Sequence, residues 1–301
     1  NLTFDGNDTA PYGAVTLRHV DDLLFDNCVF KNYHQLANPT THQTEMGARA
    51  IISCNTMSDN IWFRNSRFVG DMKYAVFIDG THGAGMIQCR IEGNPNGGGL
   101  SYPTNDDLTR DLDGDSVPDE SELRKTRYLI IDECSFSGNY GNGGGTAVGT
   151  GASEILVKDC TVDSHVNRFV GVANRVHLVN VFGGEWYYEL YDNIMVGNTV
   201  QSCNYFYFMN IIGPLSNDPD KHPPARMGKY EIRCNRILDD TGFQGWTGTT
   251  QPSRIDGPNI MEGNCLADPS CETNRCEYQA FLPMDFNEDY TVDTDDLAAV
   301  A

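Results

Sequence analysis

The sequence predicts an all-β protein, a parallel β-helix (β-solenoid) with a calcium-loop insertion and a short C-terminal EF-hand-like tail. A short strand-like pattern recurs along the chain, and its copies lie about 18 to 26 residues apart where nothing intervenes. Repeats of that length are typical of proteins in which each repeat forms one turn of a solenoid. Turn residues bound the copies, and no long helical period competes with them. Two acidic twelve-residue segments account for the loop and the tail.

The repeated pattern is an apolar alternation followed by Asn or Asp, often Cys, then a variable residue and an apolar one. Residues 23–30 show all of these features, and residues 61–68 repeat them with Ser66 in place of Cys. The other clear copies span residues 86–91, 129–136 and 155–162. Weaker copies lie near Asn180, Asn198, Asn210, Cys234 and Asn264.

These copies resemble the coil consensus of the pectate-lyase-like superfamily of right-handed parallel β-helices, over roughly residues 2–266. The resemblance implies a right-handed parallel β-helix over residues 1–266, with an insertion at about 94–126. In such a solenoid, equivalent positions of neighbouring coils stack about 4.8 Å apart. That spacing is within reach of a disulfide, but we expect a ladder of reduced, buried thiols. The ladder would include Cys28, Cys89, Cys134 and Cys160.

The chain is strongly acidic, with 42 Asp and Glu against 21 Lys and Arg, a formal net charge of -21 and a sequence pI near 4.5. Such a field repels phosphate backbones and anionic membrane surfaces and attracts divalent cations. We therefore expect no nucleic-acid partner. An acidic surface also serves solubility alone, so the charge does not identify a partner by itself. No run of about 18 apolar residues occurs, and we expect no membrane insertion.

The ten cysteines lack the paired Cys-x-x-Cys spacing of zinc and redox sites. Cys265, Cys271 and Cys276 lie in a loop-like composition, which predicts a short-range disulfide in an oxidising compartment. The chain begins at Asn1 without a charged and then apolar leader, which fits a mature or excised secreted form. We expect a secreted protein, extracellular or at the cell surface.

Residues 111–122 place oxygen ligands in the register of a twelve-residue calcium loop, because a hard cation requires six or more oxygens. Ser116 stands where an EF-hand has Gly, and the loop resembles the calcium-binding repeats of thrombospondin type 3. We expect a structural Ca²⁺ that orders the insertion, and the alternative is an acidic solvated loop. The ligands are Asp111, Asp113, Asp115, the Val117 carbonyl, Asp119 and Glu122.

Residues 285–296 repeat this register and run into a helix start at 297–300, within a Cys-containing linker and tail that spans 267–301. The segment resembles one half of a dockerin, the module that docks onto cohesins. A dockerin has two such halves, so a calcium-stabilised cap or an inter-subunit tail is an equal alternative to a cohesin-like partner. The ligands of this second Ca²⁺ site are Asp285, Asn287, Asp289, Thr291, Asp293 and Asp296.

Enzymes of the resembled superfamily cut polysaccharides, with Arg or Lys as a base and calcium in the lyases and with paired carboxylates in the hydrolases. The motif set of the polygalacturonases is not present as a set, although residues 80–83 and 105–107 contain partial matches. Weak catalytic candidates are Glu189 and, on a nearby turn, Asp163, His165 and Arg168. A lone His in a loop is more often a surface residue.

An aromatic stripe is the best candidate for glycan binding. Strand alternation over residues 186–191 and 205–208 would put four tyrosines on one outward face around Glu189. Sugars stack on such rings through their apolar faces. The alternative is that the rings pack under residues 214–224 or against another subunit. The four residues are Tyr187, Tyr191, Tyr205 and Tyr207.

Three classes of function remain open at this stage. The missing catalytic set, the two calcium loops and the open ends of a solenoid favour an extracellular structural, surface or filament-forming protein, which self-associates through its ends or its tail. The superfamily resemblance favours a polysaccharide lyase or glycoside hydrolase. The aromatic stripe is also compatible with a carbohydrate-binding or adhesive module without turnover.

Overall fold

The computed structural model confirms the predicted parallel β-helix. Every strand pairing is parallel, and the described residues form strands, turns and bends but no helix. The structure describes residues 1–10, 13–34, 50–54, 58–71, 74–78, 81–92, 100–102, 127–138, 146–150, 153–164, 168–173, 189–190, 193–201, 206–212, 225–228, 230–238, 243–249, 253–256, 260–268 and 270–271.

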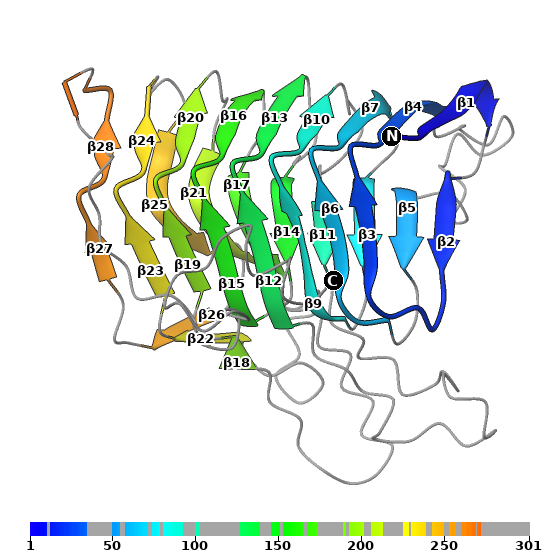
Figure 1. The fold of residues 1–301 in the computed structure, drawn as a ribbon. Coiled ribbons are helices and arrows are strands. Elements are labelled where there is room, and N and C mark those ends of the chain that lie inside the picture. The colour runs from blue at the N-terminus through cyan, green and yellow to red at the C-terminus, as the bar shows by residue number, and fades with distance from the viewer. Residues whose placement is uncertain are drawn as a thin grey trace, which may run out of the picture.

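Three long sheets, named A, B and C, form the sides of the solenoid (Figure 1). The strands of sheet A are, in spatial order, β1 (Thr3–Ala10), β4 (Val29–His34), β7 (Arg67–Asp71), β10 (Arg90–Glu92), β13 (Ser135–Gly138), β16 (Thr161–Ser164), β20 (Thr199–Gln201), β24 (Arg236–Ile237) and β28 (Cys265–Leu266). The strands of sheet B are β2 (Val15–Leu17), β5 (Ala50–Cys54), β8 (Tyr74–Ile78), β11 (Leu100–Tyr102), β14 (Thr146–Thr150), β17 (Arg168–Ala173), β21 (Phe206–Ile212) and β25 (Phe243–Thr249).

The strands of sheet C are β3 (Leu23–Asp26), β6 (Ile61–Arg64), β9 (His82–Ile87), β12 (Arg127–Asp132), β15 (Ser153–Lys158), β19 (Asn193–Val196), β23 (Tyr230–Arg233) and β27 (Ile260–Glu262). A small fourth sheet joins β18 (Glu189–Leu190), β22 (Ala225–Gly228) and β26 (Ser253–Asp256). Each full coil passes through sheets C, A and B in turn, as β3, β4 and β5 do. The small sheet adds one strand before sheet C in the last three coils.

The core consists of rows of inward side chains that stack from coil to coil. In sheet A, Phe4, Phe30 and Phe68 occupy equivalent register positions, and their rings stack with centroids 4.7 and 4.9 Å apart. In sheet C, Phe25 stacks on Phe63 at 5.1 Å. Beyond Phe68 the row in sheet A continues through Ile91, Phe136, Val162 and Val200, so it is aliphatic except at Phe136. Because coil spacing is fixed by main-chain hydrogen bonds, flat rings fit one above the other.

A two-residue corner joins sheet C to sheet A in every coil, and it explains the repeated sequence pattern. The first corner residue has a positive φ, such as 54° at Asn27 and 50° at Asn65, a conformation that Asn, Asp and Gly adopt most readily. The second corner residue points inward and is mostly buried. In chain order the second residues are Cys28, Ser66, Cys89, Cys134, Cys160, Asn198, Asn235 and Asn264.

The thiols of this corner row are free and buried, which confirms the expected ladder of reduced cysteines. Each Sγ reaches main-chain carbonyls: that of Cys134, for example, lies 3.3 Å from both Met86 O and Asp132 O. Ser66 makes the equivalent contacts through its hydroxyl. Burial raises the pKa of the Cys89 and Cys134 thiols well above the usual value, so these thiols are poor nucleophiles.

The row continues as a ladder of asparagine amides. Asn198 Nδ2 donates to Asn235 Oδ1 at 2.9 Å, and Asn235 Nδ2 donates to Asn264 Oδ1 at 3.0 Å. The same oxygens accept main-chain hydrogen bonds, including the one from the N–H of Asn198 to Asn235 Oδ1 at 3.0 Å. The ladder therefore satisfies buried main-chain groups that the corner removes from the sheets.

The structure also tests the predicted disulfide and the weaker copies of the repeat. Cys265 and Cys271 form the expected short-range disulfide, and Cys234 is disulfide-bonded as well. The weak copy near Asn210 is not a corner, because Asn210 lies inside β21 and pairs with Gly171 and Gly248 in sheet B. The copy near Asn180 and both calcium loops lie outside the described residues. Within the described part of the chain, no helix is long and apolar enough to cross a membrane.

Asn235→Ala tests the amide ladder. The substitution leaves the N–H of Asn198 and the carbonyl of Met195 buried without these partners, so the free energy of unfolding should fall by about 2–4 kcal/mol in urea denaturation. Asn264→Ala is the matched control at the last described coil, where the side chain is only half-buried, and its loss should be smaller. Equal losses would contradict the account of the ladder.

Candidate functional site

Most of the predicted site residues lie outside the described part of the chain. These are both sets of calcium ligands, three of the four stripe tyrosines (Tyr187, Tyr191 and Tyr205) and His165. Tyr207, Glu189 and Arg168 are described only in their main chain. The glycan stripe and the calcium sites therefore remain predictions.

The structure separates the remaining candidates onto different sheets. Arg168 of β17 and Tyr207 of β21 are register neighbours in sheet B. Glu189 of β18 pairs with Arg226 in the small sheet. Asp163 is exposed in β16 of sheet A, next in register to Ser137 and Gln201. Asp163 lies in β16, which ends at Ser164, and Arg168 begins β17, so these two candidates stand in strands of different sheets.

The outward face of sheet C carries a feature that the sequence reasoning missed. Its middle row is apolar and almost fully buried, although these side chains alternate with those of the core. Gly85 leaves space in this row, because a Cβ there would lie 2.7 Å from Cζ3 of Trp62. The row is formed by Trp62, Gly85, Ile130, Leu156 and Ile194.

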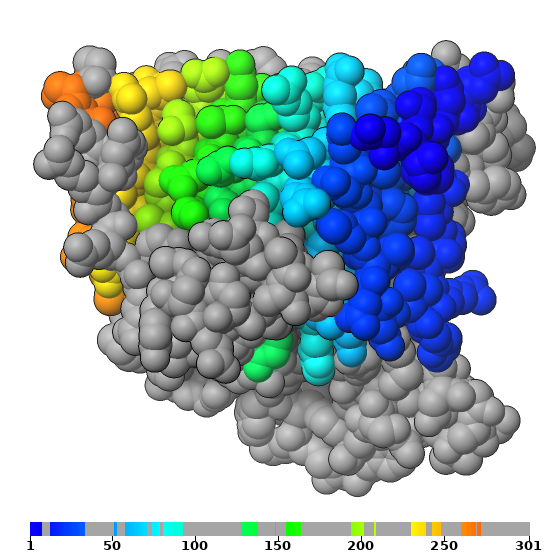
Figure 2. All heavy atoms as spheres, in the orientation of Figure 1, coloured from blue at the N-terminus to red at the C-terminus, as the bar shows by residue number. Residues whose placement is uncertain are grey.

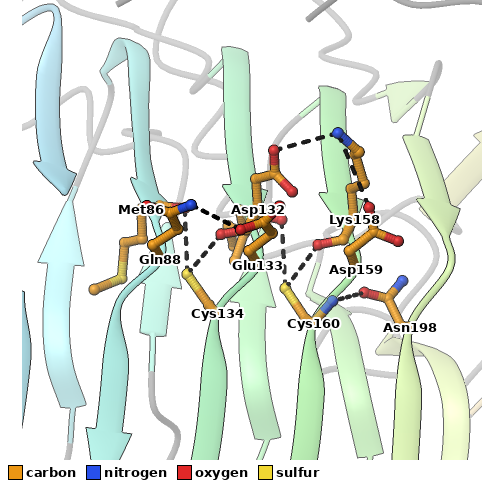
Figure 3. A network of polar contacts seen from close by, with 10 residues as sticks. Met86, Gln88, Asp132, Glu133, Cys134, Lys158, Asp159, Cys160 and Asn198 are labelled. Atoms are coloured by element: carbon orange, nitrogen blue, oxygen red, sulfur yellow. Dashed lines mark hydrogen bonds and ion pairs between the residues drawn. The ribbon is translucent and has the colours of Figure 1, made fainter. Parts of the chain in front are cut away.

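Asp132 ends β12 beside this apolar row and is only 4% exposed. Its register neighbours are Ile87 on one side and Lys158 on the other, and Val196 follows Lys158. Lys158 Nζ lies 3.4 Å from Asp132 Oδ2 (Figure 3). The other carboxyl oxygen, Oδ1, is buried and has no hydrogen-bond partner. The buried carboxyl group thus has an apolar side chain, Ile87, on one side and the amine of Lys158 on the other.

The electrostatics of the site follow from this burial. The pKa of Asp132 is raised to about 6, mainly by loss of solvent and in smaller part by the charges of Asp159 and Glu133, although Lys158 lowers it. Burial also raises the pKa of Asp159. Both carboxyl groups therefore hold a proton more readily than ordinary aspartates do. Perturbed groups of this kind mark candidate functional sites.

The corner residues complete the cluster. Glu133 follows Asp132 and accepts a hydrogen bond from Gln88 Nε2 at 2.8 Å. Lys158 Nζ lies 3.9 Å from Asp159 Oδ2, so the amine contacts two carboxyl groups. Gly197 stands in the next coil, where a Cβ would overlap Asp159 Oδ1. Among the described residues, no group of three or more His, Cys, Asp or Glu is arranged to hold a metal ion.

A comparison with known protein families identifies the family of this chain. A family model described as a right-handed beta helix region matches residues 1–182. The chain belongs to this family. The parallel coils of Figure 1 are therefore those of a right-handed β-helix. No curated protein matches the sequence.

Two solved structures are similar to the chain. One is a glycoside hydrolase, 11% identical with a TM-score of 0.39, and the match covers 85% of this chain and 51% of that one. The chain thus spans about half the length of that hydrolase. The other is the A-module of the Azotobacter vinelandii mannuronan C-5 epimerase AlgE6, 11% identical with a TM-score of 0.22, with 86% of this chain and 78% of that one covered.

Lys158→Met tests the burial of Asp132. Because the variant leaves a buried carboxyl group without its amine, we expect it to be about 3–5 kcal/mol less stable than the wild type at pH 7.5. The folded-state pKa of Asp132 is already raised to about 6 with Lys158 present. The unfolded value is near 3.9, so the stability that neutral Asp132 contributes to the variant should be fully present below about pH 4 and should be lost as the pH rises from there through the folded-state value.

The control for this measurement is the double variant Lys158→Met, Asp132→Asn. An amide does not titrate, so urea denaturation of the double variant should lack the decline attributed to Asp132. If single and double variants show the same pH profile, Asp132 is not the group responsible.

Proposed function

We propose that the protein is a secreted, calcium-stabilised β-helix with an extracellular structural role, in which copies associate end to end. The observation that carries this proposal is the exposure of inward-row side chains at the last coil. The central coils bury the same rows almost completely.

At the C-terminal end, Met261 of β27 and Leu266 of β28 continue two core rows. Their register neighbours, Ile232 and Ile237, are fully buried. Met261 itself is 53% exposed and Leu266 is 42% exposed. Two apolar side chains that belong to core rows are thus exposed at the last described coil, where a further coil would cover them.

The opposite end presents apolar side chains as well. Leu2 precedes β1 and is 63% exposed, and Phe4 and Phe25, which begin the aromatic rows, are only half-buried. Figure 2 shows the blue first coils and the orange last coil at opposite ends of the stack. A second copy placed on the last coil would bring these side chains against Met261 and Leu266.

The strand edges point the same way. Sheets A, B and C begin at β1, β2 and β3 and finish at β28, β25 and β27, and the described residues pair no strand beyond these. Since all pairings are parallel, the first strands of one copy match the direction of the last strands of another. Unpaired edges of this kind are templates for further strands, and head-to-tail contacts of one kind generate filaments.

Charge opposes this association. The net charge of -21 makes copies repel one another at low ionic strength. Added salt or divalent cations would weaken this repulsion, because at physiological ionic strength charges farther apart than a Debye length of about 8–10 Å are largely screened. The disulfide between Cys265 and Cys271 supports an oxidising, extracellular location for the assembly.

Met261→Glu tests the association. In analytical ultracentrifugation at physiological salt, the wild type should form rods that lengthen with protein concentration. The variant should associate at least about tenfold more weakly, because a carboxylate would be buried at the junction. Thr161→Glu is the matched control, since it adds the same charge on the exposed side of sheet A and should leave association unchanged. Rods that stay single at every concentration would refute the proposal.

Calcium binding is tested separately. Chelation should release bound Ca²⁺ and lower the melting temperature, because binding to the folded state alone stabilises it. Asp113→Asn and Asp285→Asn should each remove one bound ion, measured by metal analysis of the dialysed protein. A melting temperature that does not change on chelation, with no metal released, would show that both loops are solvated acidic segments.

A second candidate function is polysaccharide binding or cleavage, favoured by the polar outer side of sheet A. Asp163 is exposed there, and Arg90 is exposed two coils away, with no ion-pair partner shown for either among the described residues. Such groups supply hydrogen bonds for sugar hydroxyls. Isolated rods in the association experiment would favour this candidate, with Asp163→Ala as the variant for a glycan-binding and turnover screen.

A further inference from the structure

We propose that Lys158 and Asp132 become joined by an amide bond between Nζ and Cγ, a covalent cross-link between two neighbouring coils. The two residues face each other in register on β15 and β12. The cross-link depends neither on end-to-end association nor on calcium, so its test is independent of the tests of the proposed function.

Proximity is the first requirement, and the ion pair meets it. Nζ lies 3.4 Å from Oδ2 of the carboxyl group whose carbon it would attack. The parallel pairing of β12 and β15 fixes the positions of both Cα atoms, so little conformational entropy is lost when the amine and the acid come together. Reactants held at such distances behave as if at very high concentration, which favours a bond that does not form between free amines and acids in water.

The protonation of the acid is the second requirement, because a carboxylate resists attack by an amine. Burial beside Ile87 and Leu156 favours the neutral acid at Asp132. The apolar neighbours also keep water away from the product, which limits hydrolysis. Oδ1 has no hydrogen-bond partner, so no neighbour stabilises the carboxylate at that atom.

A proton acceptor for the ammonium group is the third requirement. Asp159 Oδ2 lies 3.9 Å from Nζ, and burial raises the pKa of Asp159 as well. A carboxyl group with a raised pKa takes up and returns a proton more readily than an ordinary aspartate does. Asp159 is therefore assigned as a positioning and proton-relay residue.

The atoms balance without any outside reagent. The Lys158 ammonium gives one proton to Asp159, and the neutral amine adds to Cγ of protonated Asp132, which forms the C–N bond. The C–O bond then breaks, and the hydroxyl leaves as water with a proton returned from Asp159. Asp159 takes up the second proton, which the nitrogen loses, and passes it to solvent through its exposed side chain, so the amide remains. One lysine ammonium and one neutral aspartic acid become one amide, one water and one proton released to solvent, with no oxidation or reduction.

The other ion pairs described in the structure lack this combination. Lys31 pairs with Asp5 at 3.1 Å, but both side chains are about 40% exposed, at 41% and 42%. The remaining pairs between strands, such as Arg64 with Asp26, use arginine. A guanidinium stays protonated and is a poor nucleophile, whereas a desolvated lysine amine is a good one.

Mass spectrometry of the full chain tests the cross-link. The purified protein, reduced and denatured, should weigh less than its sequence by one water molecule. Trypsin does not cut after an acylated lysine, so the digest should contain a branched peptide that joins the segments around Asp132 and Lys158. Lys158→Arg, which keeps the charge, should restore the full sequence mass.

Lys31→Arg is the matched control, since it alters the exposed pair and should keep the loss of water. Asp159→Asn should lower the cross-linked fraction measured in the same digest. A wild type of full sequence mass would overturn the proposal. A loss of water that maps to a linear peptide would overturn it too, because a succinimide at one aspartate has that mass without joining two segments.

Discussion

The main-chain hydrogen bond from coil to coil is the constraint on which the rest of this structure depends. It holds equivalent residues one above another at a spacing of about 4.8 Å, so each side chain must suit its own kind above and below. Phenylalanine rings meet this demand by stacking, as Phe30 does between Phe4 and Phe68. Asparagines meet it by donating to the next amide in the row. A polar side chain without a matching neighbour, such as Asp132, is left with an unpaired atom.

Local sequence features predicted the corners, whereas the buried acid depended on distant coils. The corner requires a residue that tolerates positive φ and then a small inward one, and both show in the sequence around Asn27 and Cys28. Asn210 carries a similar pattern, but its strand is set by pairing with β17 and β25. Asp132 reads as the polar residue of the repeat, yet the residue with positive φ is Glu133. The sequence around Asp132 does not indicate that this residue is buried beside Lys158, because that contact depends on the pairing of two coils.

The ends and the middle of the solenoid express the same stacking rule in opposite ways. In the middle of the solenoid, each residue of a row has a neighbour in the coil on either side. Apolar side chains are therefore buried there, and Lys158 and Asp132 lie in contact. At the last described coil, the described residues place no strand beyond β27 and β28, and Met261 and Leu266 are exposed. A repeat sequence does not by itself specify where the stacking of coils ends. The apolar side chains at the end coils must therefore be covered by another segment of the chain or by another molecule.

The corner row changes its chemistry between Cys160 and Asn198. Before that point each buried side chain in the row, a thiol or the hydroxyl of Ser66, contacts main-chain carbonyls. After it the asparagine side chains also donate to one another from coil to coil, in addition to the main-chain bonds that run through the whole solenoid. Replacing one amide therefore removes a partner from the next amide in the row, whereas replacing one thiol leaves the neighbouring thiols with their carbonyl contacts.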